Sequence, residues 1–516
     1  MTKLYPMLFI LAFSIVNAFS STLTPIPTPT SIAPLSQTQT QTHHNYERIR
    51  NHHSPSALAA SILVSDGDNF EEFDDSYSKD EMPVGDSGDN PKLSLASAIF
   101  NLVKAQVGSG VFALPAGVAA FGDVPAALVP ATFLLCLLGL LSAYAFNMIP
   151  RLTRLNGVDN KTKIKSMSAA WEDEVGKSSS WIISMCCFLT PLGTTLTFSI
   201  ILKDILGALA KSAGVTGVFS SKHTLLLGVT AAVLYPLCNL KSLASLAPVS
   251  MIGVLGTIAT CVIMIARALP NSPYFQAGSA FLNSIPVASR PSFGVIGNNA
   301  FSPQILVLVA MVATSLLAHF SSHEFCNDLE NNSPKRFAKL TAYSFSTTIL
   351  INILVMSAGF LTFGGAAQSM VLNNYSPFDV GATFSRLVVA VSLVGSFPIL
   401  FGAMKSAFFE LTRKGKVVSD RFNKLTTQGF VGLLTLGGLL LEDAGLVVSL
   451  NGAVMGSFII YAFPSIIFLK MTSRLVAEGK LESSKRLLLE RLFNKSLVGI
   501  GGLIAVFGAA VILGLI

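Results

Sequence analysis

The first candidate for a functional segment is an apolar stretch, residues 101–117. Its sequence is NLVKAQVGSGVFALPAG. Two glycines inside a helix cost roughly 1 kcal/mol each relative to alanine, so we predict a break there. At bilayer depth, irregular backbone survives only where protein or a water-filled cavity satisfies its amides, so a glycine-interrupted span predicts a binding site. The residues of the break are Val107, Gly108, Ser109, Gly110 and Val111.

Lys104 stands one turn before this break and is the least expected residue of the stretch. A charged side chain at the centre of a membrane helix costs about 2.5–3.5 kcal/mol on insertion scales unless it finds a partner or reaches the interface. Lys104 is therefore a functional candidate. The alternative is a lysine whose long side chain extends to the inner surface.

Polar side chains interrupt three later apolar stretches. They are Ser321, Ser322 and His323 at the end of residues 303–323, Ser392 and Ser396 one turn apart within 378–409, and Asn451 within 444–470. Each has a structural alternative, because serine can hydrogen-bond to its own helix and a membrane histidine can be a packing residue. Residues 303–323 contain no Gly break and no internal Pro break. The spans contain no metal-ligand or catalytic nucleophile motif, so we expect neither an enzyme nor a metal or cofactor site.

The composition places these groups in an all-α polytopic membrane protein. Hydrophobic residues make up 51% of the 516 positions and charged residues 12%, and the mean hydropathy of +0.61 exceeds that of ordinary soluble domains. The net charge of +7 does not indicate nucleic-acid binding, because the basic residues fall in short loops between apolar runs. Run length predicts eleven spans, at 94–120, 124–150, 179–210, 224–240, 243–268, 303–323, 338–363, 378–409, 425–441, 444–470 and 496–516.

The loops and the spacing of the spans predict topology. Most Lys and Arg lie in loops on the side of the N-terminal segment, whereas the opposite loops hold only Lys211, Lys222 and Arg290, so we expect the N-terminal side inside. Spans three to five and eight to ten are offset by about 200 residues, which predicts a 5+5 inverted repeat with the eleventh span as an addition. Chance spacing is the alternative.

The segment before the spans divides into three parts by composition. Residues 1–18 have the charge, apolar run and small residues of a signal peptide. Residues 19–61 are rich in Ser, Thr and Pro and nearly free of acids, as in a transit peptide, and residues 62–92 form an acidic segment expected to be disordered. Together they resemble the bipartite plastid address of algae with secondary plastids. The alternative is a disordered tail behind a chance apolar run, with an endomembrane or plasma-membrane location.

Residues 93–516 resemble the amino acid/auxin permease family, which includes system A and N and vacuolar amino acid transporters. Four segments carry the resemblance, FNLVKAQVGSGVFALPAG, HEFCNDLENNSPKRFAKL, LTFGGAAQSMVLNNYSPFDVGATFSRLVVAVSLVGSFPILFGAMKSAF and LVVSLNGAVMGSFIIYAFPSIIFLK. The resemblance implies a leucine-transporter-like fold that moves amino acids with a sodium or proton gradient. The expected partners are an amino acid, a coupling proton or sodium ion and the lipid bilayer.

The resemblance also implies roles for the polar groups. Amides freed at residues 107–111 would bind the carboxylate of an amino acid and carbonyls its ammonium, while Ser321, Ser322 and His323 would line the site or inner gate. Sodium-coupled relatives look as though they place an asparagine at the position of Lys104. We therefore expect proton-coupled or sodium-independent transport, with Ser392 and Ser396 in ion coupling and Asn451 in a gate. A membrane-embedded amino acid sensor without net transport is the alternative.

Overall fold

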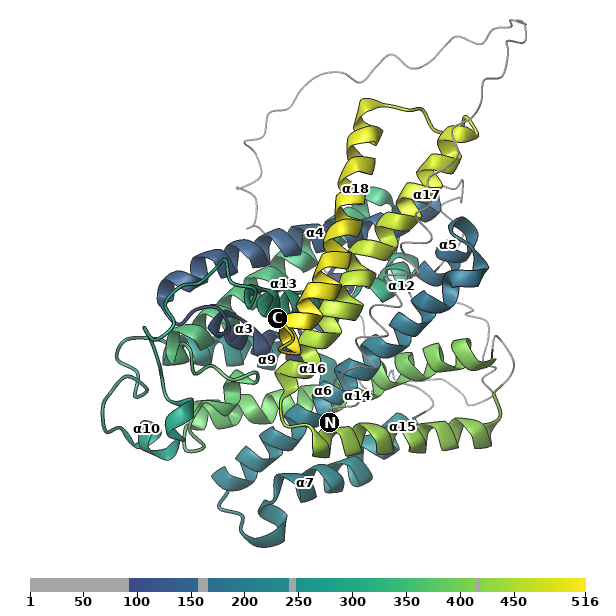
Figure 1. The fold of residues 1–516 in the computed structure, drawn as a ribbon. Coiled ribbons are helices and arrows are strands. Elements are labelled where there is room, and N and C mark those ends of the chain that lie inside the picture. The colour runs from purple at the N-terminus through teal and green to yellow at the C-terminus, as the bar shows by residue number, and fades with distance from the viewer. Residues whose placement is uncertain (1–91, 156–165, 241–246, 414–417) are drawn as a thin grey trace, which may run out of the picture. The chain divides into compact units, whose positions relative to one another are not determined.

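The computed structural model describes residues 92–155, 166–240, 247–413 and 418–516 (Figure 1). The predicted signal and transit peptides and nearly all of the acidic segment lie outside these residues, so those assignments remain predictions. Every named element in the described ranges is a helix. The first described helix, α2, begins at Leu95.

Helices follow the apolar runs of the sequence. In the first half they are α2 Leu95–Gln106, α3 Leu114–Ala119, α4 Leu128–Leu155, α6 Ser180–Ser212, α7 Lys222–Val229, α8 Tyr235–Cys238 and α9 Ala247–Arg267. In the second half they are α11 Ile305–Ser315, α12 Ser322–Asp328, α13 Pro334–Phe363, α14 Val380–Arg413, α15 Asp420–Leu440, α16 Ala444–Leu450, α17 Phe463–Ala477, α18 Lys485–Leu503 and α19 Ala509–Ile512.

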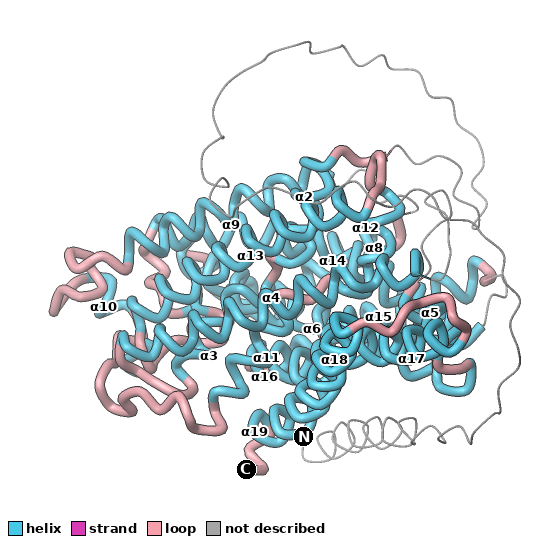
Figure 2. Tube along the Cα trace, turned by 90° about the horizontal axis from the view of Figure 1, so that it is seen from above, coloured by secondary structure: helices cyan, strands magenta, loops and turns pink. Residues whose placement is uncertain are grey.

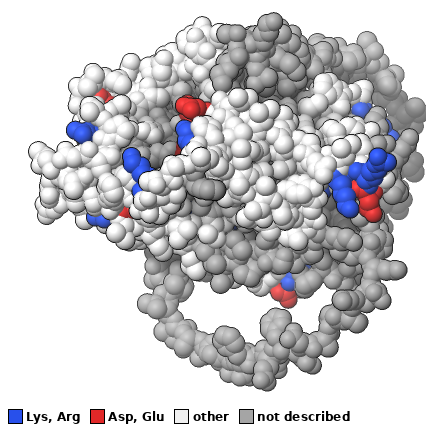
Figure 3. Space-filling view, turned by 90° about the horizontal axis from the view of Figure 1, so that it is seen from below, with Lys and Arg blue, Asp and Glu red and all other residues white. Residues whose placement is uncertain are grey.

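Length and hydropathy support a polytopic membrane protein. In the described ranges, seven helical stretches are long and apolar enough to cross a bilayer, or eight when the pair α2 and α3, bent by 46°, is taken as one span. Two shorter apolar helices, Lys222–Cys238 and Gly253–Arg267, lie where the fourth and fifth spans are predicted. One face carries few Lys, Arg, Asp or Glu side chains among its described residues and has wide uncharged areas (Figure 3), as a lipid-facing surface requires.

Two of the predicted spans, the first and the sixth, are interrupted in the structure. The first span of each half is interrupted: α2 is separated from α3 by residues 107–113, and α11 from α12 by residues 316–321. The long helix α14 packs along α6 and α9, and α13 packs along α2 and α4 (Figure 2). The two interrupted spans are therefore held by long neighbouring helices.

The sixth span is interrupted although its sequence contains no Gly break and no internal Pro break. Its polar side chains instead form hydrogen bonds with backbone carbonyl groups. The Thr314 hydroxyl donates to the Val448 carbonyl at 2.8 Å, and the Ser315 hydroxyl donates to the Val312 carbonyl at 3.0 Å. Hydroxyl groups that compete for backbone carbonyls bend membrane helices, which accounts for the end of α11 at Ser315.

The two breaks lie against each other at one position. A Cβ added to Gly110 would lie 3.5 Å from both the Cα and the backbone nitrogen of Ser315. The small residue allows the backbone of the first span to approach that of the sixth, which is the close packing typical of small residues in membrane helices. The irregular segments of the two halves thus form one region.

A short surface helix anchors the loop between α4 and α6. This helix, α5, spans Met167–Glu174. Its Trp171 is fully buried, packs edge-on against Phe463 at 5.6 Å and donates from Nε1 to the Ser179 hydroxyl at 2.9 Å. Glu174 forms a bidentate pair with Arg474, so α5 is fastened to α17.

Candidate functional site

A cavity of about 380 Å³ lies beside the two helix breaks. Its walls come from α2, the segment after α2, α6, α9, the region from α11 to α12, and α14. The predicted site residues that line it are Lys104, Val107, Gly108, Gly110, Ser321, Ser392 and Ser396. Residues from three predicted groups, far apart in sequence, therefore meet at one cavity.

Lys104 is held inside this cavity by the eighth span. Its Nζ donates to the Ser392 hydroxyl at 2.6 Å, and a Cβ added to Gly253 of α9 would lie 2.6 Å from the same nitrogen. The glycine leaves room for the ammonium group between α2, α9 and α14. Within the described ranges Lys104 has no ion pair with a carboxylate. The ammonium is thus bonded to a neutral hydroxyl next to the break.

The backbone of the break offers amide donors at its outer half. The amide of Val107 donates to Val103 at 2.7 Å, and that of Gly108 donates to Gln106 at 2.9 Å, so both are already used. The helical turn Ser109–Ala113 then begins, and the first amides of a helical turn have no acceptor within it. The amides of Ser109 and Gly110 come first in this turn and so have no acceptor within it.

Other predicted site residues lie behind the cavity wall. Val111 is fully buried in the core. The Ser322 hydroxyl donates to the Phe146 carbonyl at 2.9 Å and so points toward α4. His323 is half-buried and, like Ser322, is not among the residues lining the cavity. The structure brings Ser321 to the cavity and leaves its two neighbours outside.

Asn451 lies one layer behind the cavity. Its Nδ2 donates to the Thr190 carbonyl and to the Thr194 hydroxyl, both at 3.3 Å, and these two threonines of α6 line the cavity. Gly193 lies against the Asn451 amide, since a Cβ there would be 3.1 Å from Cγ. Any change in the position of Asn451 would therefore be transmitted to the threonine wall.

Comparison with known proteins agrees with this geometry. The sequence profile described as "Transmembrane amino acid transporter protein" matches residues 91–513, which include all the helices of the described ranges. The chain belongs to this transporter family. The match confirms the resemblance that the four sequence segments indicated.

Relatives of this amino acid transporter family member come from animals and plants. It is 24% identical to "Putative sodium-coupled neutral amino acid transporter 11" of Danio rerio, over 77% of this chain and 83% of that protein. It is 22% identical to "Amino acid transporter AVT6E" of Arabidopsis thaliana, over 74% of this chain and 77% of that protein.

Solved structures of two transporters are similar to this chain. Inward-facing Mhp1 is 11% identical with a TM-score of 0.47, covering 82% of this chain and 92% of its own. MhsT in complex with L-phenylalanine is 12% identical with a TM-score of 0.48, covering 83% of this chain and 99% of its own.

The cavity of this transporter family member also contains residues that were not predicted to line it. Thr190, Thr194 and Phe198 of α6 form one wall. Glu324 lines it too. Gln106 could have been found from the sequence, because it is a polar residue directly before VGSGV. The α6 residues could not, because nothing in the sequence of α6 shows that this helix faces the break.

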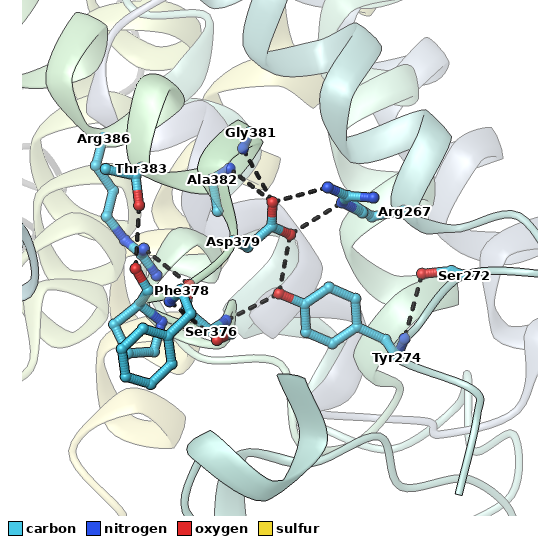
Figure 4. A network of polar contacts seen from close by, with 11 residues as sticks. Arg267, Ser272, Tyr274, Ser376, Phe378, Asp379, Gly381, Ala382, Thr383 and Arg386 are labelled. Carbon is cyan, nitrogen blue, oxygen red and sulfur yellow. Dashed lines mark hydrogen bonds and ion pairs between the residues drawn. The ribbon is translucent and has the colours of Figure 1, made fainter. Parts of the chain in front are cut away.

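A second polar network joins α9 to the start of α14 (Figure 4). Asp379 accepts two hydrogen bonds from Arg267, at 2.8 and 2.9 Å, and one from the Tyr274 hydroxyl at 3.1 Å. Arg386 donates to backbone carbonyls, including that of Tyr375 at 2.6 Å. The network fixes the loop before α14.

Asp123 joins the corner between α3 and α4 to a distant loop. The carboxylate accepts hydrogen bonds from the backbone amides of Val295, Ile296 and Gly297 at 2.5, 2.8 and 2.7 Å. Burial of the carboxyl group by itself would raise the pKa of Asp123, but these amides outweigh burial and bring the pKa below its ordinary value. The loop is thus tied to the first broken span.

Proposed function

We propose that this protein is a secondary active transporter of amino acids whose transport is proton-coupled or sodium-independent. The observation that carries the proposal is the position of the Lys104 ammonium, 2.6 Å from the Ser392 hydroxyl and beside the break of the first span. The family and the names of its relatives support an amino acid as the substrate.

The broken helices supply the groups that a zwitterion needs. The amides of Ser109 and Gly110 would receive the carboxylate at the positive end of a helical turn. Backbone carbonyls at the end of α2 and the hydroxyl of Ser321 would receive the ammonium group. The cavity of about 380 Å³ is within the range of small-molecule sites and larger than a small amino acid requires.

Coupling of transport to an ion gradient would depend on the Lys104 ammonium group beside this site. A sodium ion requires several oxygen ligands, and the Ser392 hydroxyl is already bonded to a positive group. Lys104 would take the place of the ion, and release and uptake of its proton would alter the charge of the site during transport. Ser396 lies one turn further along the same cavity wall and would receive the ammonium group in a second position. The relative named as sodium-coupled supports the opposite coupling, so the ion must be measured.

Uptake by proteoliposomes tests the proposal. Purified protein would be supplied with a panel of labelled amino acids in sodium or choline medium, with and without a pH step across the membrane. We expect uptake in choline that increases when the outside is made more acidic than the lumen. A strict sodium requirement would refute the role of Lys104, while the assignment to amino acid transport would stand.

The alternative function is a membrane-embedded amino acid sensor that signals through its N-terminal acidic segment. Binding of an amino acid to purified protein without net flux into proteoliposomes would favour the sensor. The predicted plastid address is a separate proposal, and imaging of a fluorescently tagged full-length chain in its own cells tests it against endomembrane and plasma-membrane locations.

A further inference from the structure

Gln106 is a buried residue of the cavity wall whose side-chain amide is not fully paired. It is the last residue of α2, is only 3% exposed and lines the cavity directly before the break. Its Oε1 accepts a hydrogen bond from the Thr348 hydroxyl at 2.8 Å. Its Nε2 has no hydrogen-bond partner among the described residues.

The bond to Thr348 fixes the direction of this amide. Thr348 is fully buried in α13, so it holds Oε1 on the side of α13 and leaves the two N–H groups of Nε2 as the free donors. One turn further on, Asn352 donates to the Ser315 hydroxyl at 3.0 Å, which is the end of α11. The same helix α13 therefore positions Gln106 at the first break and Ser315 at the second.

An unpaired buried donor is unfavourable. Leaving such a group without an acceptor costs about 1–3 kcal/mol, and native proteins retain few of them. At a cavity wall the acceptor can be supplied by a ligand. Because an amide N–H₂ group only donates, it can bind a carboxylate oxygen and cannot bind an ammonium group.

We propose that the Gln106 side-chain amide donates to the α-carboxylate of the transported amino acid, next to the backbone amides of Ser109 and Gly110. The inference rests on the proposed transport function and adds a specificity-determining side chain to it. Gln106 would make the protein discriminate between an amino acid and its α-carboxamide, because the carboxamide presents one neutral oxygen where the acid presents two charged ones.

The test compares ligand pairs that differ only at this group. Wild-type protein and Gln106→Leu, which keeps a side chain of similar bulk and removes both amide atoms, would be measured by competition for uptake. The probes are L-alanine, L-leucine, L-glutamine and L-glutamate, each with its α-carboxamide. We expect Gln106→Leu to weaken binding of the acids about tenfold and to change binding of the carboxamides less than twofold.

Two further variants keep the test decisive if Gln106→Leu does not fold. Gln106→Asn keeps the amide but shortens its reach, and Thr348→Val removes the group that orients it. Both should lower the ratio of acid affinity to carboxamide affinity.

An unchanged ratio in all folded variants, or equal weakening of acid and carboxamide, overturns the inference. Absence of uptake for every amino acid by wild-type protein would instead overturn the proposed function. Weakened binding of amino acids that spares analogues without an α-amino group would show that the amide faces the cavity through its oxygen, and would also overturn the inference.

Discussion

Replacement of Lys104 by methionine separates coupling from substrate binding. Met is similar in length to the lysine chain and carries no charge, so the cavity keeps its shape while the Ser392 hydroxyl loses its ammonium partner at 2.6 Å. Removal of the charge also avoids the roughly 2.5–3.5 kcal/mol that a lysine costs within a membrane helix. We therefore expect the variant to be at least as stable as the wild type.

The expected accumulation of amino acid follows from the free energy that one proton releases when it crosses the membrane down a pH difference. A pH difference of one unit is worth about 1.4 kcal/mol per proton, which supports roughly tenfold accumulation if one proton moves with each amino acid. Lys104→Met should abolish this accumulation, so that the internal and external concentrations become equal. Exchange of internal for external amino acid without a gradient should continue, because the amide donors of the break are unchanged.

The assay is uptake into proteoliposomes with an acidic exterior, measured to steady state in choline medium. Lys405→Met is the matched control, because Lys405 also lies in a span, on α14, but donates to Thr427 and does not line the cavity. The control should accumulate substrate as the wild type does. Continued tenfold accumulation by Lys104→Met would refute the reasoning, as would equal loss in the control.

Three further predictions concern the groups that hold the fold around the site. Asp379→Asn should lower the free energy of unfolding by about 3 kcal/mol, because the buried carboxylate loses its charged pair with Arg267; chemical denaturation in detergent measures it, and a loss below about 1 kcal/mol would contradict a buried pair. The pKa of Asp123 is lowered in the folded state, so the ionised carboxylate should stabilise the folded protein fully above the ordinary aspartate pKa of about 3.9. This stabilisation should decline as the pH falls below that value. Asp123→Asn should remove this pH dependence from the thermal unfolding curve. Gly452→Ala should strongly reduce thermal stability, because its Cβ would overlap the Ala310 carbonyl oxygen, whereas Gly499→Ala, which meets open space, should not.

Some parts of the site were predictable because they depend on local sequence. Glycines at residues 108 and 110 weaken a helix locally, and Lys104 is unusual in any apolar run, so both were found without knowledge of the fold. Ser392 and Ser396 were placed near the site only through the expected neighbourhood of the first and eighth spans. The cavity lining contains both, together with Lys104.

Other parts depend on which faces of the helices meet, and no local pattern encodes that. The sixth span breaks without a glycine because Thr314 and Ser315 find partners on α16 and within α11. Ser322 differs from Ser321 by one residue, about 100° of helix rotation, and so faces α4 and not the cavity. Thr348 orients Gln106 across more than two hundred positions of sequence.

The sequence by itself determined the membrane class, the broken first span and the buried lysine, because apolar run length, glycine content and the cost of a buried charge are properties of single segments. Only the tertiary structure decided which hydroxyl receives the Lys104 ammonium, which serine reaches the cavity and which amide keeps a free donor. These depend on the rotation and approach of separate helices, where Gly253 admits the lysine and Thr348 directs Gln106.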